Sequence, residues 1–298
     1  MREVPADYAF ATPPPDHADR LRDDPAALRA LWPAAGVLLL DKHGDVGATD
    51  DGRQHAVFRG SDLFPEMPES AIFLVLHEGR GWFALATGTT FAEDAKRIDL
   101  RAAALTLPAF AAGLHAQARA LAHWQASHRH CPNCGHRLRS IRAGHAARCD
   151  HCVREHYPRT DIAIIVAVSD GQRLLLGRQS PWPAKRYSVI AGFVEPGERL
   201  EDAVVREVAE EAGVRVRSSR YAGSQPWPFP ANLMVGFEAD GEPDEPRFGG
   251  ELEDARWFSA AQIHAALAAG ELLLSPRLSI SSWLIRRWLA RQGAPLLA

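Results

Sequence analysis

Three glutamates with helical spacing stand in the segment GFVEPGERLEDAVVREVAEEAGV, which runs from Gly192 to Val214. Glu210 and Glu211 follow Glu207 by three and four residues, so on a helix the three side chains project from one face. Carboxylates this close repel one another unless a cation neutralises them, and oxygen-rich clusters of this kind suit Mg²⁺ or Mn²⁺. The pattern therefore favours a divalent-metal site over the alternative, which is a charged helix face in contact with solvent.

The residues around this cluster have types that would position it. Arg206 precedes the first glutamate and could orient one carboxylate through a bidentate pair. Gly213 is typical of the residue that follows the last turn of a helix. The glycines of the 192–197 loop give the backbone the freedom to approach a polyphosphate closely.

All four cysteines of the chain lie in two CxxC pairs, CPNC and CDHC, with 14 residues between them. Two such turns complete a closed site of four thiolates, which predicts a structural zinc ion with no open position for catalysis. A redox motif would normally occur once, beside a βαβ unit, so the sequence favours zinc. The predicted ligands are Cys131, Cys134, Cys149 and Cys152.

Histidines and arginines are also concentrated around the cysteines. The histidines at 128, 130, 136, 145 and 151 are interpreted as surface residues rather than zinc ligands. The arginines between Arg129 and Arg159 leave two alternatives open, a nucleic-acid contact or a basic face in contact with solvent. The net charge of −3 favours the second.

Length and composition limit the class of protein. The chain has 298 residues, of which 46% are apolar and 24% charged. This length predicts about two domains, and the composition excludes disordered, collagen-like and disulfide-scaffold proteins. Apolar runs such as residues 162–168 are far shorter than the roughly 20 residues of a membrane helix. With no visible signal peptide and cysteines assigned to zinc, the sequence predicts a cytoplasmic protein with no membrane partner.

Hydrophobic periodicity and turn residues predict the secondary structure. Residues 9–29, rich in Pro, Asp and Arg, favour an irregular lead-in. A first α+β block has predicted strands at 36–41, 56–59, 71–77 and 82–87, and a helix at 110–127. A last block has predicted strands at 161–168, 172–178, 187–190, 233–238 and 255–258, and helices at 200–212, 260–269 and 279–291.

The segment from Gly192 to Val214 resembles the signature of the Nudix hydrolase family, G-x5-E-x7-R-E-U-x-E-E-x-G-U with U aliphatic. Every fixed position matches. The resemblance implies an α/β fold, the Nudix α/β/α sandwich with a mixed sheet. It also implies metal-dependent hydrolysis of a nucleoside diphosphate linked to another group. The implied metal ligands are Glu207, Glu210 and Glu211; the implied structural residues are Gly192, Glu198, Arg206 and Gly213.

The segment SQPWPFP, from Ser224 to Pro230, follows the signature by about a dozen residues. Its three prolines make it stiff and extended, so that Trp227 and Phe229 could stack on a flat base. The alternative is a loop packed on the core. SQPWPFP after a four-cysteine ribbon and a Nudix signature resembles the NADH pyrophosphatase subfamily, although Asn232 stands where that subfamily usually has Ser.

The subfamily resemblance implies further residues and partners. It implies a homodimer in which Phe193 and Tyr157 sandwich the nicotinamide, and substrate contacts by Gln225, Trp227 and Phe229. It also implies one more metal-binding glutamate, for which the spacing in GGELEDARWF favours Glu251 over Glu253.

These observations predict three domains: an N-terminal α+β domain at 1–126, a zinc ribbon at 127–158 and a Nudix hydrolase domain at 159–298. The resemblance implies hydrolysis of NADH, and less efficiently NAD⁺, to NMNH or NMN and AMP. Mg²⁺ or Mn²⁺ would grip the diphosphate, and Glu211 or Glu251 would accept a proton from water. Removal of an NAD cap from RNA and hydrolysis of another substrate such as ADP-ribose stay open. The intact signature argues against a non-catalytic binding module.

Overall fold

The computed structural model describes residues 7–11, 16–49, 51–86 and 96–296. Its contacts divide the chain into two compact units. The ribbon unit consists of Thr12–Thr160 and Pro228–Ala231, and the signature unit of Met1–Ala11, Asp161–Trp227 and Asn232–Ala298. Each unit is therefore assembled from segments that are distant in the sequence.

The signature unit contains a six-stranded mixed sheet in the order β14-β15-β10-β11-β16, with β13 paired to β10. Strand β10 is parallel to β15 and antiparallel to β13. The strands are β10 (Asp161–Ser169), β11 (Arg173–Gln179), β13 (Ile190–Phe193), β14 (Val216–Trp227), β15 (Asn232–Gly241) and β16 (Leu252–Ser259). A separate parallel pair joins β12 (Arg186–Tyr187) to β17 (Leu273–Leu274).

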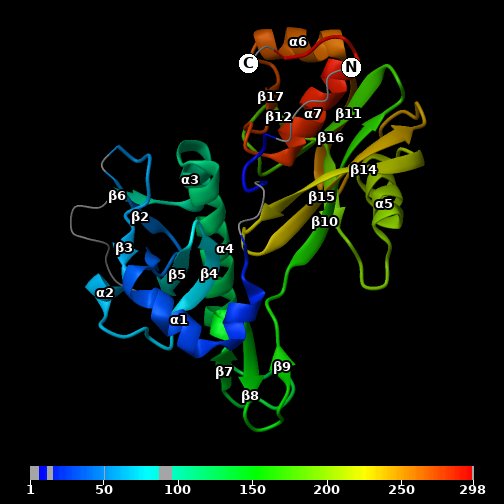
Figure 1. Cartoon of the computed structure of the whole chain (residues 1–298). Helices are drawn as coiled ribbons and strands as arrows, with labels where there is room; N and C mark the ends of the chain where they lie inside the picture. Colours follow the sequence, from blue (N-terminus) through cyan, green and yellow to red (C-terminus); the bar gives the residue numbers. More distant parts are fainter. Residues whose placement is uncertain (1–6, 12–15, 50, 87–95, 297–298) are drawn as a thin grey trace. The chain divides into compact units, whose positions relative to one another are not determined.

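Helices cover both faces of this sheet, as Figure 1 shows. Strand β10 explains why, because its side chains are apolar on both sides. Ile164 and Val166 pack with α5 (Leu200–Ala212), whereas Ile165 packs in the core formed with α6 (Ala260–Ala268) and α7 (Ile280–Arg291). The predicted α/β/α sandwich with a mixed sheet is confirmed.

Two details of this sheet differ from the sequence expectation. The strand predicted at residues 187–190 is divided, since β12 ends at Tyr187 and β13 begins at Ile190. Between them Ser188 forms an isolated bridge with Gly177. The twelve-residue strand β14 had no counterpart among the predicted strands, because its polar and proline-rich sequence lacks the usual apolar alternation.

The first described residues belong to the signature unit. The Tyr8 ring lies edge-on to Trp283 at 5.3 Å, and its hydroxyl donates to the carbonyl of Ser224 at 3.1 Å. The backbone N–H of Ala9 donates to the carbonyl of Leu278 at 2.9 Å. This segment is thus packed beside helix α7.

The ribbon unit is built on a second six-stranded sheet, ordered β4-β5-β1-β2-β6, with β3 paired to β1. Its strands are β1 (Gly36–Leu40), β2 (Val46–Ala48), β3 (Phe58–Arg59), β4 (Ile72–His77), β5 (Arg80–Ala86) and β6 (Lys96–Ile98). Its α-helices are α1 (Pro25–Leu31), α2 (Gly60–Leu63), α3 (Leu100–Thr106) and α4 (Ala109–Ser127). Thr87, predicted to end a strand, lies outside the described residues.

The prediction of an irregular lead-in over residues 9–29 is wrong for its second half. A 3₁₀ turn occupies Asp19–Asp23, and helix α1 begins at Pro25. The Asp24 carboxylate accepts from the backbone N–H groups of Ala26 and Ala27, and proline is favoured at the first helical position. The Asp-Pro pair was the missed signal for this helix.

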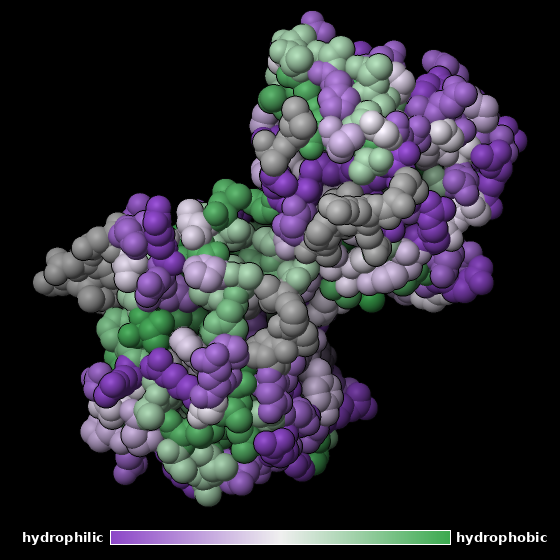
Figure 2. Space-filling model, turned by 45° about the horizontal axis from the view of Figure 1, so that its top comes forward, coloured by the Kyte–Doolittle hydropathy of each residue, from purple (hydrophilic) through white to green (hydrophobic). Residues whose placement is uncertain are grey.

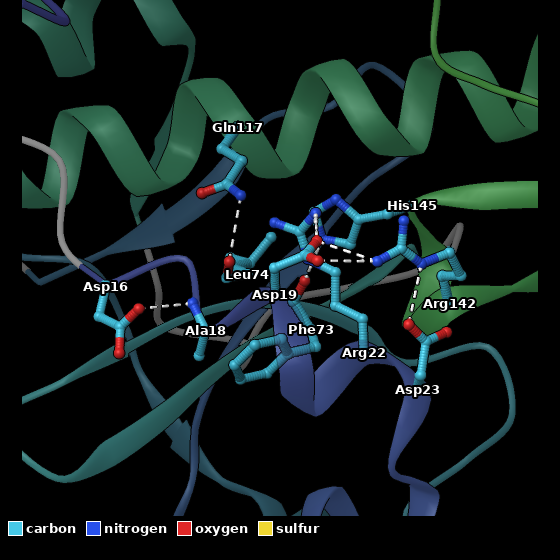
Figure 3. A network of polar contacts seen from close by, with 10 residues as sticks. All are labelled: Asp16, Ala18, Asp19, Arg22, Asp23, Phe73, Leu74, Gln117, Arg142 and His145. Atoms are coloured by element: carbon cyan, nitrogen blue, oxygen red, sulfur yellow. Dashed lines mark hydrogen bonds and ion pairs between the residues drawn. The ribbon is translucent and has the colours of Figure 1, made fainter.

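The zinc-ribbon segment forms a three-stranded sheet of β7 (Leu138–Ile141), β8 (Ala146–Cys149) and β9 (Glu155–His156). Figure 3 shows how it is tied to the rest of its unit: Arg142 reaches Asp19 at 3.0 Å and Asp23 at 3.2 Å. A ring nitrogen of His145 contacts the carbonyl of Phe73 at 2.7 Å. The ribbon is thereby held in a fixed orientation on the N-terminal sheet.

The surface differs between the units. On the face seen in Figure 2, hydrophobic surface is more extensive on the ribbon unit than on the signature unit. Among the described residues, no helix is both long and apolar enough to cross a membrane.

Candidate active site

Helix α5 carries the predicted metal ligands and is fixed by its buried face. Ala203, Val204 and Val208 pack into the core under the sheet. The helix ends at Ala212, and Gly213 follows in the left-handed conformation with φ 66°. Glycine adopts this conformation without steric cost, so its position in the signature is explained.

Gly192 is required by the close approach of strand β13 to this helix. A Cβ atom at Gly192 would lie 1.9 Å from the carboxyl carbon of Glu207, a distance that no real contact allows. Any other residue would push the Glu207 carboxylate out of place. The first glycine of the signature therefore positions a predicted metal ligand.

Arg206 joins the loop to the helix. Its guanidinium donates to Glu198 at 2.8 Å, to Glu207 at 2.8 Å and to Glu210 at 3.1 Å. It also donates to the carbonyl of Phe193 at 2.9 Å. These contacts lower the pKa of Glu198 and raise that of Arg206. Arg206 thus orients two of the three clustered carboxylates, as the sequence predicted for one.

Glu211 is the most unusual member of the cluster. It is 6% exposed, and its Oε1 atom is buried without a hydrogen-bond partner. Burial, followed by the charges of Glu207, Glu251 and Glu210, raises its pKa to about 8. A buried carboxylate oxygen with no donor, surrounded by other carboxylates, fits a divalent cation, because hard oxygen ligands suit such ions.

Glu253 lies in β16 and Glu251 directly precedes it, and the two side chains have different partners. Glu251 is among the charges that raise the pKa of Glu211, which associates it with the cluster. Glu253 instead accepts a hydrogen bond from the Arg178 guanidinium and is paired with it. These partners favour Glu251 over Glu253 as the additional ligand, and the assignment stays a prediction.

The predicted substrate-binding residues lie in different surroundings. Phe193, in the signature unit, and Tyr157, in the ribbon unit, are 57% and 59% exposed. Gln225 is fully buried, and its amide nitrogen donates to the carbonyls of Ala9 and Leu278. Its amide oxygen accepts from the N–H of Ile280 at 2.8 Å. The amide of Gln225 is thus occupied by the chain itself, and its contact with substrate stays a prediction.

The two aromatic residues of SQPWPFP belong to different units. Trp227 ends β14 in the signature unit, whereas Phe229 belongs to the ribbon unit. There the guanidinium of Arg101 lies 4.3 Å from the centre of the Phe229 ring, and that of Arg119 lies 5.7 Å from it. Neither arginine could be predicted from the sequence, because no local motif relates them to Phe229.

The four predicted zinc ligands are brought together. Their sulfur atoms all lie within 4.8 Å of one another, with Cys131 and Cys152 at 3.5 Å and Cys134 and Cys149 at 3.4 Å. Zn–S bonds of about 2.3 Å in a tetrahedron require sulfur separations of roughly 3.8 Å, so the set fits zinc. His156, which the sequence analysis did not consider, places its Nε2 3.4 Å from the sulfur of Cys131.

Family models match along most of the chain. A NUDIX domain matches residues 158–278, an NADH pyrophosphatase zinc ribbon domain 126–157, and an NADH pyrophosphatase-like rudimentary NUDIX domain 32–124. The NAD-capped RNA hydrolase NudC of Mycobacterium bovis is 39% identical over 294 residues, an alignment that covers 92% of each chain. The chain belongs to the Nudix hydrolase family.

Two further relatives bear similar names. The NAD-capped RNA hydrolase NudC of Mycobacterium tuberculosis is also 39% identical, with 92% of each chain covered. The human NAD-capped RNA hydrolase NUDT12 is 36% identical over an alignment of 230 residues, which covers 70% of this chain and 50% of the human protein. As a Nudix hydrolase, this chain is an enzyme that hydrolyses pyrophosphate bonds and carries a zinc ribbon.

Proposed function

We propose that this Nudix hydrolase cleaves the pyrophosphate bond of NADH, and less efficiently that of NAD⁺, to give NMNH or NMN and AMP. The observation that carries the proposal is the buried Glu211, which has one carboxylate oxygen without a hydrogen-bond donor and three other glutamates that raise its pKa, in a chain that aligns over 92% of its length with an NAD-capped RNA hydrolase. The dinucleotide supplies a diphosphate that such a cluster can engage only through a cation.

Different residues of the chain would bind the metal, accept a proton and position the metal ligands. Glu207, Glu210, Glu211 and Glu251 would hold the metal, Mg²⁺ or Mn²⁺. When bound, the cation neutralises charge on the diphosphate and promotes attack by water. Glu211 or Glu251 accepts the proton of the attacking water. Arg206 keeps the side chains of Glu207 and Glu210 in place through its hydrogen bonds to both carboxylates.

Aromatic side chains would bind the bases. Phe193 and Tyr157, both exposed, are proposed to sandwich the nicotinamide, with Trp227 and Phe229 walling the substrate. We infer that the enzyme is a homodimer. We also place it in the cytoplasm, because cysteines there remain reduced and can serve as zinc ligands rather than form disulfides.

Chromatography of NADH incubated with the purified enzyme and Mg²⁺ or Mn²⁺ tests this function. Equal amounts of NMNH and AMP, abolished by EDTA, are expected, with Glu211→Gln as the inactive control. Absence of products from folded protein with one bound zinc ion would overturn the assignment. Size-exclusion chromatography with light scattering tests the dimer.

The NAD cap of an RNA 5′ end is a second candidate substrate for the same site, because it contains the same diphosphate. The names of the full-length relatives favour it. A comparison of kcat/KM between NADH and a short NAD-capped RNA decides which substrate the enzyme prefers. ADP-ribose serves as the control for a Nudix activity that does not need nicotinamide.

A further inference from the structure

The zinc ribbon presents a row of charged side chains on one face of its sheet. Arg139 of β7 lies opposite Arg148 of β8, and Arg148 lies opposite Glu155 of β9. Cross-strand partners point to the same side of a sheet, and neighbouring strands are about 4.8 Å apart. The three side chains therefore form one row across the ribbon.

The zinc cluster lies on the other side of this sheet. Cys149 and His156 are the neighbours of Arg148 and Glu155 along their strands, so they point to the opposite face. His156 contacts the sulfur of Cys131 there. The sheet thus separates the negatively charged thiolates from Arg139 and Arg148.

Two arginines directly opposite each other destabilise a sheet in the absence of an anion. Glu155 offsets part of this repulsion, but its carboxylate also accepts a hydrogen bond from the Tyr157 hydroxyl at 2.8 Å. Arg139 pairs with Asp150 at 3.2 Å, and both side chains are more than half exposed. Exposed pairs of this kind are weak, so a phosphate can replace Asp150.

Charge in the ribbon is unbalanced as a whole. Residues 127–158 contain six arginines and two acidic residues, in a chain whose net charge is −3. Arg142 is neutralised by Asp19 and Asp23, whereas Arg137, Arg139 and Arg148 follow one face of the sheet and its extension. Three of the six arginines of this segment therefore lie on or beside the arginine row.

We propose that the arginine row, Arg139 and Arg148 with Arg137 beside them, binds the phosphodiester backbone of a single-stranded RNA that carries an NAD cap. This inference rests on the second substrate of the proposed function. Arginine forks match phosphate oxygens, and a free dinucleotide has no phosphodiester to offer beyond its diphosphate. The row therefore distinguishes capped RNA from NADH.

The test uses the full-length, zinc-loaded enzyme and two variants, Arg148→Gln and the double variant Arg139→Gln/Arg148→Gln. Fluorescence anisotropy measures binding of a ten-nucleotide single-stranded RNA, with and without the NAD cap. We expect the double variant to weaken binding by about tenfold at low salt. The slope of log K against log salt should fall by about 0.7 for each lost phosphate contact. Hydrolysis of NADH should stay within twofold of wild type.

Two matched variants sharpen the result. Asp150→Asn frees Arg139 and removes a negative charge, so it should tighten RNA binding by about two- to threefold. Arg29→Gln removes an exposed charge from α1 in the same unit and should leave binding unchanged. Arg148→Gln should not lower Tm, because it relieves the repulsion from Arg139, whereas a structural arginine would lower it.

The outcomes separate this inference from the proposed function. Unchanged RNA binding or salt slope in the double variant overturns the inference, as does an equal loss by Arg29→Gln. An equal fall in RNA binding and NADH hydrolysis also overturns it, since the row would then not act on RNA alone. If the enzyme binds RNA through the row but hydrolyses neither NADH nor the cap, the proposed function fails and the binding surface stands.

Discussion

Glu211 and Glu238 lie in the same unit and expose only 6% and 3% of their surface, yet their surroundings are opposite. Glu238 accepts from Arg220 at 2.9 Å, from Arg287 at 2.9 Å and from Arg291 at 2.7 Å. Burial alone would raise the pKa of Glu238, but the arginines outweigh it and lower the pKa. Glu211 has carboxylates around it instead, and its pKa is raised.

The comparison separates a structural carboxylate from a binding one. The chain supplies the positive charge for Glu238, so this group needs nothing from outside. At Glu211 the chain supplies further negative charge and leaves an oxygen without a donor. Burial is nearly equal in the two cases. The charges of the neighbouring side chains, rather than burial, therefore indicate which glutamate is suited to bind a cation.

The largest expected effect is on activity at Glu211. The Glu211→Gln variant should lower kcat by roughly 10²- to 10⁴-fold, because it removes a metal ligand and a candidate base. Without metal the variant should unfold at an equal or higher temperature than wild type, since a repelled carboxylate is gone. Steady-state kinetics and metal-free thermal melts measure both quantities. A destabilised variant with normal kcat would break the comparison.

Glu238→Gln should lower stability and leave kcat nearly unchanged, which is the reverse of the effects expected for Glu211→Gln. Removing this carboxylate leaves three arginines around a neutral side chain, so the free energy of unfolding should fall by about 3 kcal/mol. Urea denaturation measures the loss. The kcat of the protein that remains folded should be close to wild type, and Arg220→Gln, at the most exposed of the three partners, should cost less than the glutamate.

In the ribbon unit, two buried histidines remain uncharged, which is a third way in which burial affects a titratable side chain. Burial lowers the pKa of His55 to about 3 and that of His115 to about 4. The folded forms stay neutral while the unfolded forms take up protons below pH 6.5. Stability is therefore complete above about pH 6.5 and falls in acid by about 1.4 kcal/mol per pH unit for each histidine. Urea unfolding at several pH values should show this slope, and His55→Phe should reduce it.

The smallest expected effect is at Glu253. Glu253 is 40% exposed, and its partner Arg178, although only 13% exposed, also donates to the carbonyl of Pro183, so Glu253→Gln should change the free energy of unfolding by about 1 kcal/mol or less. Its activity should stay within about threefold of wild type, whereas Glu251→Gln should lose most activity. Assays of the two neighbours under identical metal concentrations test the assignment; the opposite ranking would exchange their roles.

Local signals predicted much of the fold. Helix α5 has the predicted bounds, because the spacing of its apolar residues and the glycine that follows it are local features of the sequence. The four cysteines were likewise identified from spacing alone. Helix α1 was missed although Asp24 and Pro25 mark its beginning, and the polar sequence of β14 hid a long strand.

Contacts between distant residues could not be predicted in this way. Glu238 meets Arg291 across 53 residues, and nothing local to either residue specifies the pair. Gln225 was assigned to substrate from its place in a motif, while the structure gives its amide three partners of the chain. The sequence names the types of residue at a site, whereas tertiary packing decides which of their polar atoms remain available.

The packing of Tyr8 and Ala9 against residues 224–283 has a consequence for synthesis of the protein. These residues leave the ribosome before the zinc ribbon, but their partners in β14 and α7 are made only after it. Domains generally fold as units while the chain emerges, so the zinc ribbon can take up its metal before these partners are made. The signature unit is completed only when helix α7 packs against Tyr8.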